Sequence, residues 1–466
     1  MGSLVRPRGR ADAEIRARPN SSSRTEWDRL HHPTSMRLAP ILSVLLLVGC
    51  GESAKLAVED GTGRSPVIPE PTSTLIPTVN IAEAQGWPRG RQPVAAPGHT
   101  VNWFAAGLDH PRWLHVLPNG DVLVAETNAP PEAGTKGLIG RIRAYFFAKA
   151  GAGVPSADRI TLLRDADLDG RAEIQTPFLT NLASPFGMAL TEDDLYVANS
   201  GSVVRFDYPE NATSITTAPD TIAILPTGTY NQHWTRNLIA SDDGRTLYVA
   251  VGSASNVGEH GLDEEVGRAA IWAIDLEDGS TSMYATGLRN PVGMAWEPTT
   301  GALWTAVNER DELGSDLVPD YMTSVLEGGF YGWPYSYFGD TVDTRVEPRP
   351  DLVSQAIVPD YALGPHTASL GLEWVPAGRF GTEAGMVVGQ HGSWNRKPKS
   401  GYKVVFVPFE DGMPVGLPRD ILTGFLSDDE EDAYGRPVGV ATAADGTLLV
   451  ADDVGNVVWR VAPLAE

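Results

Sequence analysis

The chain has 466 residues, a net charge of −23 and a sequence pI near 4.8. Such an acidic surface repels phosphate backbones and anionic headgroups, so nucleic-acid binding is not expected. The 49 glycines and 36 prolines supply the turns of an all-β repeat fold. No stretch after residue 50 approaches the roughly 20 apolar residues of a membrane span.

The first 50 residues are predicted to be an N-terminal extension followed by a lipoprotein-type signal peptide. Residues 1–35 are rich in Arg and Ser, and MRLAPILSVLLLVGC then begins at Met36 with one Arg and an apolar run of about ten residues. The stretch ends in Leu47 to Cys50, which resembles a bacterial lipobox, where the cysteine becomes lipid-modified. Cys50 is therefore the predicted lipidation site. The protein is expected to be exported to the periplasm or cell surface and anchored to a bacterial membrane through the lipid only.

Two alternatives stay open at this end of the chain. A cleaved secretory signal with an incidental cysteine would look similar, and either Met1 or Met36 could be the start. Cys50 is the only cysteine in the chain, so no intramolecular disulfide can form.

Residues 51–96 are rich in Pro, Ser, Thr and Gly and show no sustained period, as in SPVIPEPTSTLIPTVN. This composition predicts a disordered linker that holds a domain away from a membrane. The catalytic domain itself is expected over residues 97–464.

Within that domain one pattern recurs six times: a polar or proline-containing entry, an apolar strand, a turn rich in Gly, Asp, Asn or Pro, and a second strand. The six copies are His110–Glu126, Ser184–Ser200, Trp234–Ser253, Asn290–Val307, Ala368–Gln390 and Arg436–Asp453. Their starts lie about fifty to eighty residues apart, the spacing of propeller blades. Each unit must bury its sheet faces against neighbours, so the pattern predicts an all-β, six-bladed β-propeller.

An acidic turn lies between the first two copies. LRDADLDGRAE (Leu163–Glu173) places Asp165, Asp167 and Asp169 at the spacing of a calcium loop. The acid that an EF-hand needs at position twelve falls on Thr176, so the stretch is interpreted as a turn or as a weak surface calcium site.

In a propeller the first strand of each blade lines the central channel, so the residues just before these strands should converge at one mouth. Those residues are His110, Ser184, Gln232 with His233, Arg289 with Asn290, His366 with Thr367, and Arg436. Asn395 and Arg396 follow the fifth copy and could add a third guanidinium. Like charges gathered in this way cost free energy unless an anion binds them, so a polyanionic small molecule is predicted at the mouth.

Several of these residues also have a purely structural interpretation. Asn290 could close a turn, Arg289 and Arg436 could pair with carboxylates of neighbouring blades, and His110 is interpreted as structural. His233 stands between polar and aromatic residues in YNQHWTRN, which suits a base whose pKa is near neutrality. The aromatic cluster Phe330–Tyr335 could stack a flat ligand or pack between blades.

Several longer motifs resemble a known family. LDHPRWLHVLPNGDVLVAE, LRNPVGMAW, VNERDELGSDLVPDY, GGFYGWPYSYFG, GQHGSWNR and GRPVGVA are similar to the sorbosone dehydrogenase-like branch of the soluble aldose (glucose) dehydrogenases that depend on pyrroloquinoline quinone (PQQ). The resemblance covers residues 100–463. It implies a six-bladed propeller that binds PQQ and calcium at the channel mouth and oxidises an aldose or aldehyde-type sugar by hydride transfer.

Residue by residue, the resemblance implies that His233 is the general base. It also implies that Arg289, Asn290 and Arg436 bind the cofactor, and that Arg396 stands where the family has a lysine. The main-chain carbonyls of Glu309 and Arg310, next to Asn308, would bind calcium, which would act as a Lewis acid. Gln232 and His366 are weaker candidates for substrate contact.

The chain also departs from the family pattern. Glu309 and Arg310 replace a Gly-Pro in the metal turn, Gln232 replaces an acid beside the catalytic histidine, and Tyr434 replaces a second cofactor arginine. These differences put glucose specificity in question and leave the electron acceptor open. Two other function classes remain: a calcium-dependent propeller hydrolase such as a lactonase, and a non-enzymatic propeller that binds a partner or a glycan.

Overall fold

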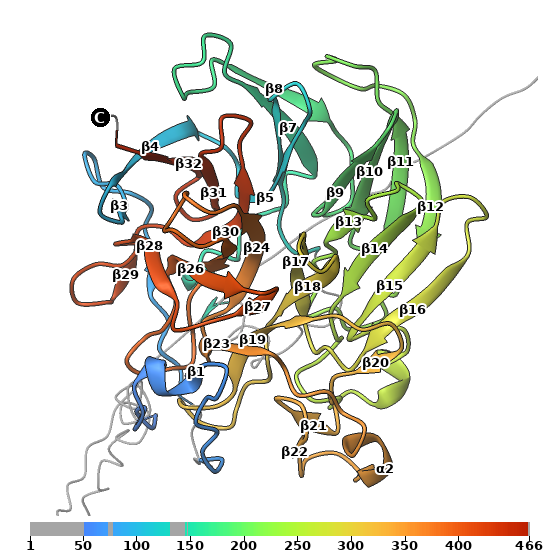
Figure 1. Ribbon diagram of the computed structural model, residues 1–466, viewed down its shortest axis with the longest axis vertical. Helices are drawn as coiled ribbons and strands as arrows, with labels where there is room; N and C mark the ends of the chain where they lie inside the picture. The colour runs from blue at the N-terminus through green and yellow to red at the C-terminus, as the bar shows by residue number, and fades with distance from the viewer. Residues whose placement is uncertain (1–50, 73–77, 131–144, 147, 465–466) are drawn as a thin grey trace, which may run out of the picture. The chain divides into compact units, whose positions relative to one another are not determined.

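The computed structural model describes residues 51–72, 78–130, 145–146 and 148–464 (Figure 1). The predicted signal peptide and Cys50 lie outside these residues. Within the described part of the chain no helix has the length and apolar character needed to cross a membrane. The chain folds into a mostly β, six-bladed β-propeller, as the repeats predicted.

The first three blades follow the chain in order. The first blade contains β5 (Pro111–Val116), β6 (Val122–Glu126), β7 (Arg159–Arg164) and β8 (Ile174–Leu179). The second contains β9 (Met188–Thr191), β10 (Asp194–Asn199), β11 (Ser202–Asp207) and β12 (Asp220–Ile224). The third contains β13 (Leu238–Ala240), β14 (Thr246–Val251), β15 (Ala270–Asp275) and β16 (Thr281–Thr286), to which β20 (Gly329–Phe330) adds in parallel.

The other three blades complete the ring. The fourth contains β17 (Pro291–Glu297), β18 (Ala302–Val307), β19 (Pro319–Ser324) and β23 (Tyr361–Pro365). The fifth contains β24 (Ser369–Val375), β25 (Gly385–Gln390), β26 (Lys403–Glu410) and β28 (Arg419–Thr423), and β27 (Met413–Pro414) pairs with β26. The sixth contains β30 (Pro437–Thr442), β31 (Leu448–Asp452), β32 (Val457–Pro463) and β4 (His99–Ala106).

The sixth blade joins the two ends of the domain. Strand β4 precedes the first blade in sequence, yet it pairs antiparallel with β32 from Ala106↔Val457 to His99↔Pro463. Figure 1 shows the blue β4 beside the dark red β32. The ring is therefore closed by backbone hydrogen bonds between residues more than 350 positions apart, and neither β4 nor β32 is left as a free edge on this side.

The segment predicted as a disordered linker has structure of its own, which corrects that expectation. It contains η1 (Val58–Gly61), β1 (Thr62–Gly63), β2 (Glu83–Ala84) and β3 (Val94–Ala95). Strand β1 extends the fourth blade beside β23, β2 pairs with β29 (Asp432–Ala433), and β3 extends the fifth blade beside β28. Composition favoured disorder, but backbone pairing with exposed strand edges orders these short segments.

The remaining elements belong to loops. They are η2 (Leu262–Glu265), β21 (Ser336–Tyr337), β22 (Thr341–Val342) and α2 (Pro350–Val353).

A glycine that recurs in the repeats explains how the inner strands meet. It occupies the same place in SPFG, NPVG, SLG and RPVG, at Gly187, Gly293, Gly371 and Gly439. A Cβ on Gly293 would lie 2.5 Å from the Leu370 carbonyl oxygen, and one on Gly439 would lie 2.8 Å from that of Arg112. The missing side chain lets the first strand of one blade touch that of the next, and all six inner strands are in contact around the channel.

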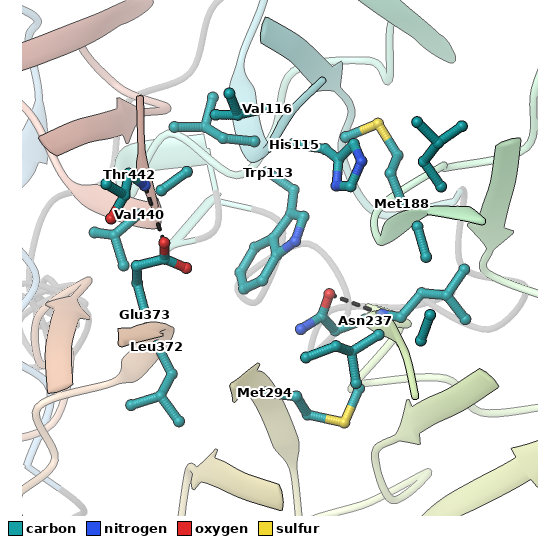
Figure 2. A pocket seen from close by; sticks show the side chains of 17 residues that line it. Trp113, His115, Val116, Met188, Asn237, Met294, Leu372, Glu373, Val440 and Thr442 are labelled. Atoms are coloured by element: carbon teal, nitrogen blue, oxygen red, sulfur yellow. Dashed lines mark hydrogen bonds between the residues drawn. The ribbon is translucent and has the colours of Figure 1, made fainter. Parts of the chain in front are cut away.

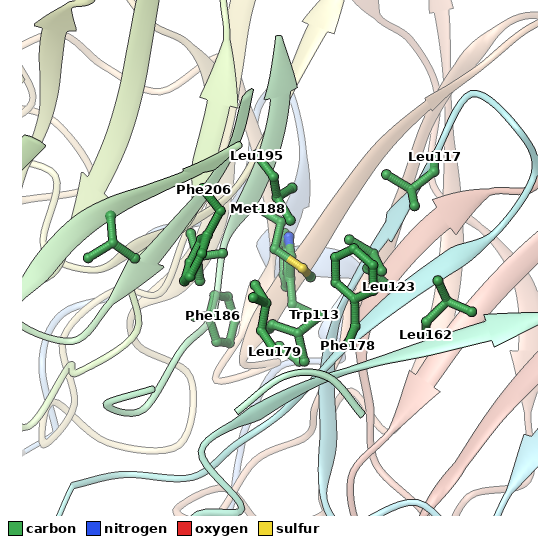
Figure 3. Close-up of a cluster of buried hydrophobic side chains, with 14 of the residues drawn as sticks. Trp113, Leu117, Leu123, Leu162, Phe178, Leu179, Phe186, Met188, Leu195 and Phe206 are labelled. Carbon is green, nitrogen blue, oxygen red and sulfur yellow. The ribbon is translucent and has the colours of Figure 1, made fainter. Parts of the chain in front are cut away.

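The hydrophobic core lies between adjacent blades. Figure 3 shows the cluster between the first two, where Leu123, Leu162 and Phe178 of one sheet face Leu195 and Phe206 of the other. These side chains are almost entirely buried. Packing of sheet faces, together with hydrogen bonds between blades, holds the blades in place, and the loops at the strand ends carry polar groups.

Candidate active site

The candidate site lies at the end of the channel where the six inner strands begin, which we call the entry mouth. His233 stands just before the inner strand of the third blade. Its Nδ1 lies 2.9 Å from both the main-chain carbonyl oxygen and the Oγ of Ser253. A carbonyl can only accept, and Ser253 Oγ already donates to the Ser255 carbonyl at 2.6 Å. The network therefore assigns the proton to Nδ1 and leaves the lone pair on Nε2.

The electrostatic surroundings keep His233 neutral. Burial, followed by the positive charge of Arg289, holds the pKa of His233 well below its usual range. A neutral imidazole with an available Nε2 lone pair can take a proton from a hydroxyl group. The position of the lone pair suits a general base, but the pKa is lower than the near-neutral value expected from the sequence, because the site is buried beside Arg289.

Gly252 brings His233 and Asn290 together. A Cβ at position 252 would collide with His233 Cβ and with Asn290 Oδ1. The Asn290 side chain is buried, and its Oδ1 has no hydrogen-bond partner. Asn290 therefore presents an unpaired amide oxygen beside the imidazole, which is unfavourable unless a further group binds there.

Arg289 is buried and makes five hydrogen bonds, one for each of its N–H groups. Its Nε and Nη2 bind the carbonyl oxygen and Oδ1 of Asn256 at 3.1 and 3.0 Å, and Nη2 also reaches Asp311 Oδ2 at 3.4 Å. Its Nη1 binds the carbonyl oxygens of Asn308 and Glu309 at 3.2 and 2.7 Å. Arg289 thus contributes positive charge to the mouth while its donors are committed to the protein.

This arrangement bears directly on the expected metal ligands. The Glu309 carbonyl, expected to bind calcium, accepts from the Arg289 guanidinium instead. The Arg310 side chain pairs with Asp343, and both are buried. A divalent cation on the same carbonyl would lie beside a guanidinium and be repelled by it. The Glu309 carbonyl therefore does not fit a calcium site, and this disfavours the expected Glu309–Arg310 pair of ligands.

Asp311 and His366 form an ion pair next to Arg289. His366 Nδ1 lies 3.5 Å from Asp311 Oδ1, and its Nε2 lies 2.8 Å from the Gly314 carbonyl. Burial alone would raise the pKa of Asp311, but the hydrogen bond to His366 and the charge of Arg289 outweigh it and lower that pKa to about 2. Burial would likewise lower the pKa of His366, but Asp311 outweighs it and raises that pKa. With Asn395, which donates to Asp311 at 2.8 Å, these residues form what we call the Arg289 cluster: Asn256, Arg289, Asp311, His366 and Asn395.

Arg436 lies on the other side of the mouth. Its Nε and Nη2 bind the carbonyl oxygens of His391 and Gly392 at 3.0 and 2.9 Å, and its guanidinium lies 5.2 Å from the centre of the Tyr402 ring. A chain of contacts links it to the base: His391 binds Asp453, Asp453 binds Arg112, and Arg112 lies 5.8 Å over the ring of Trp234, the residue after His233.

Arg396 does not join these residues. Its Nη1 and Nη2 bind the carbonyl oxygens of Pro398 and Leu56 at 2.9 and 3.0 Å. Burial lowers the pKa of Arg396 despite the nearby carboxylate of Asp316, which lies 3.8 Å away. The expected third cofactor arginine therefore holds the N-terminal segment against the domain, and only its neighbour Asn395 reaches the mouth.

Sequence reasoning placed His110 at the mouth but missed the rest of a second polar group, which we call the Asp453 cluster: His110, Arg112, His391 and Asp453. Asp453 Oδ2 lies 2.5 Å from Arg112 Nη1, 2.9 Å from His391 Nε2 and 3.6 Å from His110 Nε2. Burial and then the charge of Arg436 lower the pKa of His391 to about 3. Burial works to raise the pKa of Asp453, but His391, His110 and Arg112 hold it well below its usual range.

Three buried atoms of the Asp453 cluster lack a hydrogen-bond partner: His110 Nε2, Arg112 Nε and Asp453 Oδ1. Its residues come from the first, fifth and sixth blades. The motif GQHGSWNR contains His391 and could have signalled it, but the pairing with Asp453 depends on the closure of the ring.

The other predicted residues play smaller parts. Gln232 is half-buried and its N–H donates to the Ala254 carbonyl at 3.3 Å, and the Ser184 N–H donates to Asp158 at 2.8 Å. Trp333 is buried and donates to the Asn256 carbonyl at 3.0 Å, so the aromatic cluster packs between blades and supports the Arg289 cluster.

The acidic turn lies far from the entry mouth. In the described residues, the only group of three or more His, Cys, Asp or Glu side chains whose ligand atoms lie within 4.8 Å of one another is Asp165, Asp167, Asp169 and Glu173. It occupies the β7–β8 turn, at the opposite ends of the strands from the mouth. Its carboxylates are mostly exposed and cap backbone N–H groups within the same turn.

Comparison with known proteins gives a family and several relatives. The family described as TrAA12-like matches residues 160–322 and 352–463. An uncharacterized protein of Borreliella burgdorferi is 28% identical over 292 residues, which are 60% of this chain and 76% of that protein. The pyrroloquinoline quinone-dependent pyranose dehydrogenase of Coprinopsis cinerea is 27% identical over 57% of this chain, but the match spans only 44% of that enzyme's length. The pyrroloquinoline quinone-dependent sugar dehydrogenase of Hypocrea jecorina is 25% identical over 53% of this chain and 57% of its own length.

Solved structures share the fold. The carbohydrate-active enzyme of family AA12 from Trichoderma reesei aligns with a TM-score of 0.64 at 20% identity, covering 84% of this chain and 100% of that one. The holo PQQ domain of the Coprinopsis cinerea pyranose dehydrogenase gives a TM-score of 0.63 at 22% identity, with 80% and 98% covered. The PQQ-bound aldose sugar dehydrogenase of Streptomyces coelicolor gives 0.51 at 18% identity, with 80% and 100% covered.

Proposed function

The chain belongs to the TrAA12-like family, and on that premise we propose that it is a PQQ-dependent dehydrogenase that oxidises an aldose or an aldehyde-type sugar. The family relationship supports the reaction class: two relatives are named as pyrroloquinoline quinone-dependent dehydrogenases of pyranose and sugar. The specific substrate, a sorbosone-like sugar in our proposal, comes from the sequence motifs alone.

The geometry of His233 carries the mechanistic part of the proposal. Its Nδ1 is anchored to Ser253, its Nε2 keeps a lone pair, and its low pKa keeps that lone pair free at neutral pH. In the proposed reaction His233 Nε2 accepts the proton of the substrate's anomeric or hydrate hydroxyl group. The nearby charge of Arg289 disfavours the imidazolium that results, so the proton should leave quickly for solvent or product.

The residues at the mouth fit an anionic, polar cofactor. The guanidinium groups of Arg112, Arg289 and Arg436 lie there. Unpaired buried atoms of Asn290, Arg112 and His110 offer hydrogen bonds. When bound, PQQ would supply the electrophilic carbon that accepts a hydride. Arg112 Nε would donate to it and Asn290 Oδ1 would accept from it, and Arg436, which uses three of its five N–H groups on main-chain carbonyls, would offer further donors. Arg289, whose donors are all used, would act through its charge. Calcium at Glu309 and Arg310 does not fit, so no step is assigned to it.

The carboxylates at the mouth make a calcium-dependent hydrolase a weaker proposal. Asp311 pairs with His366 and Arg289, and Asp453 pairs with Arg112 and His391. Each carboxylate is neutralised by protein cations instead of being gathered with others around a metal position.

Two further parts of the proposal concern substrate contact and location. Gln232, half-buried beside His233, is proposed to contact the sugar, and His366 is proposed to position Asp311. On the sequence pattern alone, Cys50 is proposed to carry a lipid that anchors the protein at the periplasmic face or the cell surface.

The test uses the full chain with added PQQ and measures dye reduction over a panel of aldoses and aldehydes. Bound-cofactor absorbance is recorded in parallel. We expect PQQ-dependent turnover, and His233→Ala should lower kcat by roughly 10²–10⁴-fold with absorbance unchanged. His99→Ala, at the outer strand β4, is the matched control and should turn over normally. PQQ binding without turnover of any sugar would contradict the dehydrogenase proposal, and native turnover by His233→Ala would contradict the base assignment. The assay is run with and without calcium, because a strict calcium requirement would contradict the Arg289 arrangement.

A further inference from the structure

The central channel contains a cavity of about 320 Å³ that the proposed reaction does not use. All six inner strands line it, namely β5, β9, β13, β17, β24 and β30. We call it the distal cavity, since its lining residues come three to seven positions after the mouth residues of the same blades, as Glu373 comes after His366 and Met294 after Asn290. At about 3.3 Å per strand residue, the distal cavity lies on the order of 10–20 Å further along the channel.

Two blades break the glycine rule at the distal cavity. In the first blade Trp113 stands where four others have glycine, and in the third blade Asn237 does. A Cβ on Gly439 would lie 3.1 Å from Trp113 Cα, and one on Gly187 would lie 2.8 Å from Asn237 Cα, so the positions are equivalent in space. Figure 2 shows the Trp113 ring extending into the cavity between Glu373 and Asn237. Trp113 and Asn237 therefore add an aromatic ring and an amide group to the channel surface, where the other four blades have glycine.

Glu373 is the one carboxylate of this surface, and no Lys or Arg is among the residues that line the cavity. It is half-buried, and its Oε1 accepts the Thr442 N–H at 3.0 Å, the single hydrogen bond that the described residues give it (Figure 2). Its neighbours in the cavity wall include Trp113, Met188, Met294 and Leu372, whose side chains are apolar. Ionisation of an acid in such apolar surroundings costs free energy, and a bound cation would offset that cost.

His115 is the only other titratable group in the lining. Burial lowers the pKa of His115 to about 4, so it is neutral at physiological pH and does not repel a cation. Burial raises the pKa of Glu373 to about 7 against the opposing hydrogen bond from Thr442. The carboxylate is therefore ionised above neutrality and is easily neutralised below it.

We propose that the distal cavity is a binding site for a small organic ammonium ion, whose charged nitrogen pairs with the Glu373 carboxylate and whose alkyl part lies against Trp113 and the two methionines. An indole ring attracts an ammonium group through its π face, and methionine side chains adapt to alkyl chains. A potassium or sodium ion would find one carboxylate and few other oxygens, whereas an anion would be repelled. The cavity volume suits a ligand of a few carbon atoms.

Binding should depend on pH in a defined direction. Only ionised Glu373 pairs with the ammonium group, so affinity is full above pH about 8 and falls as the pH drops through about 7. One unit below that pKa, about one carboxylate in eleven is ionised, and the apparent Kd should rise about tenfold. The neutral His115 adds no charge over this range.

The experiment measures the Kd of butylammonium for the full chain by titration calorimetry at pH 8.5 and pH 6. No PQQ is added, so the result does not depend on the proposed function. We expect saturable binding that weakens about tenfold at pH 6, and at least a tenfold loss in Glu373→Gln at pH 8.5. Glu383→Gln is the matched control, because it removes one negative charge from an exposed ion pair with Arg419 in the same blade and should bind normally.

Several outcomes would overturn the proposal. Equal affinity for butanol and butylammonium would show that the carboxylate is not recognised. Full competition by KCl at constant ionic strength would show an inorganic cation site. If Glu373→Gln does not fold, the pH dependence of the unaltered protein decides, since a pH-independent Kd excludes pairing with Glu373.

Discussion

The two polar groups at the entry mouth are built on opposite principles. The Arg289 cluster satisfies its central guanidinium with five acceptors, of which three are main-chain carbonyls. The Asp453 cluster has a carboxylate at its centre, and that carboxylate holds Arg112, His391 and His110 through side chains only.

The difference concerns what each cluster can still bind. The guanidinium of the Arg289 cluster is closed, because each of its N–H groups has an acceptor, and Asn395 Oδ1 is the one side-chain atom of this cluster that is buried without a partner. The Asp453 cluster leaves His110 Nε2, Arg112 Nε and Asp453 Oδ1 buried without partners. Unpaired buried polar atoms are costly and mark places where a ligand or water completes the hydrogen bonding. We therefore expect the closed cluster to set the electrostatic field and the open cluster to contact the ligand.

The difference between the two clusters is tested most strongly by removing their carboxylates one at a time. Asp453→Ala strands a buried Arg112 and should lower the free energy of unfolding by about 3–5 kcal/mol. Asp311→Ala should cost only about 1–3 kcal/mol, because carbonyl acceptors still hold Arg289. Urea denaturation of both variants measures the difference. Equal losses would show that the main-chain acceptors do not protect the Arg289 cluster.

A pH titration of stability tests the Arg289 cluster alone. Asp311 has a folded pKa of about 2, below its unfolded value of about 3.9, so its contribution is present above pH 4 and is lost as the pH falls toward 2. The loss should amount to about 2–3 kcal/mol. His366, whose folded pKa is raised, contributes below its unfolded pKa of about 6.5 and loses that contribution as the pH rises through its folded value.

The contribution of Asp311 at acid pH is measured as the difference in unfolding free energy between the unaltered chain and Asp311→Asn from pH 4 to pH 2. That subtraction removes the titration of other acids. If the difference between the two proteins stays constant over this range, Asp311 is not held ionised by His366 and Arg289.

Substitution of Gly252 is expected to have a smaller effect on stability, and it tests the contact between His233 and Asn290. In Gly252→Ala the new Cβ collides with His233 Cβ and Asn290 Oδ1, and the resulting strain should cost about 1–3 kcal/mol and displace the base. We expect kcat of the PQQ-supplemented protein to fall by more than the decrease in the folded fraction explains. Gly301→Ala is the control for loss of a glycine, since a Cβ there meets nothing within 4 Å, although its positive φ adds some strain. Normal kcat in Gly252→Ala would show that the His233–Asn290 contact is dispensable.

The smallest effect is expected at the acidic turn. Asp167→Asn removes an exposed carboxylate whose contact lies within its own turn, so unfolding free energy should change by less than about 0.5 kcal/mol. Turnover should be unchanged, as the turn lies at the far ends of the blade strands. A large loss of stability on calcium removal that disappears in Asp167→Asn would instead identify the turn as a structural calcium site.

Local sequence patterns were enough to predict the architecture. Alternating apolar strands and turn residues repeat six times, so the blade number follows from periodicity, and an x-P-x-G start marks three of the six inner strands, at Ser184–Gly187, Asn290–Gly293 and Arg436–Gly439. His233 was also predictable, because a histidine before an inner strand lies at the channel mouth in any closed ring. These features depend on short stretches of sequence, and the same physics acts on each copy.

The sequence by itself determined the six-bladed ring and part of the charged set at its mouth, namely His233, Arg289, His366 and Arg436. Only the tertiary structure decided what those residues bind. Arg289 turns toward the Glu309 carbonyl, Arg396 holds the N-terminal segment, and Asp453 binds partners from two other blades. The order of the described residues 51–72 and 78–96 was likewise decided by strand edges distant in sequence. The physical reason is that hydrogen-bond partners of buried charges are chosen by proximity in space, and proximity across a closed ring cannot be inferred from neighbouring residues.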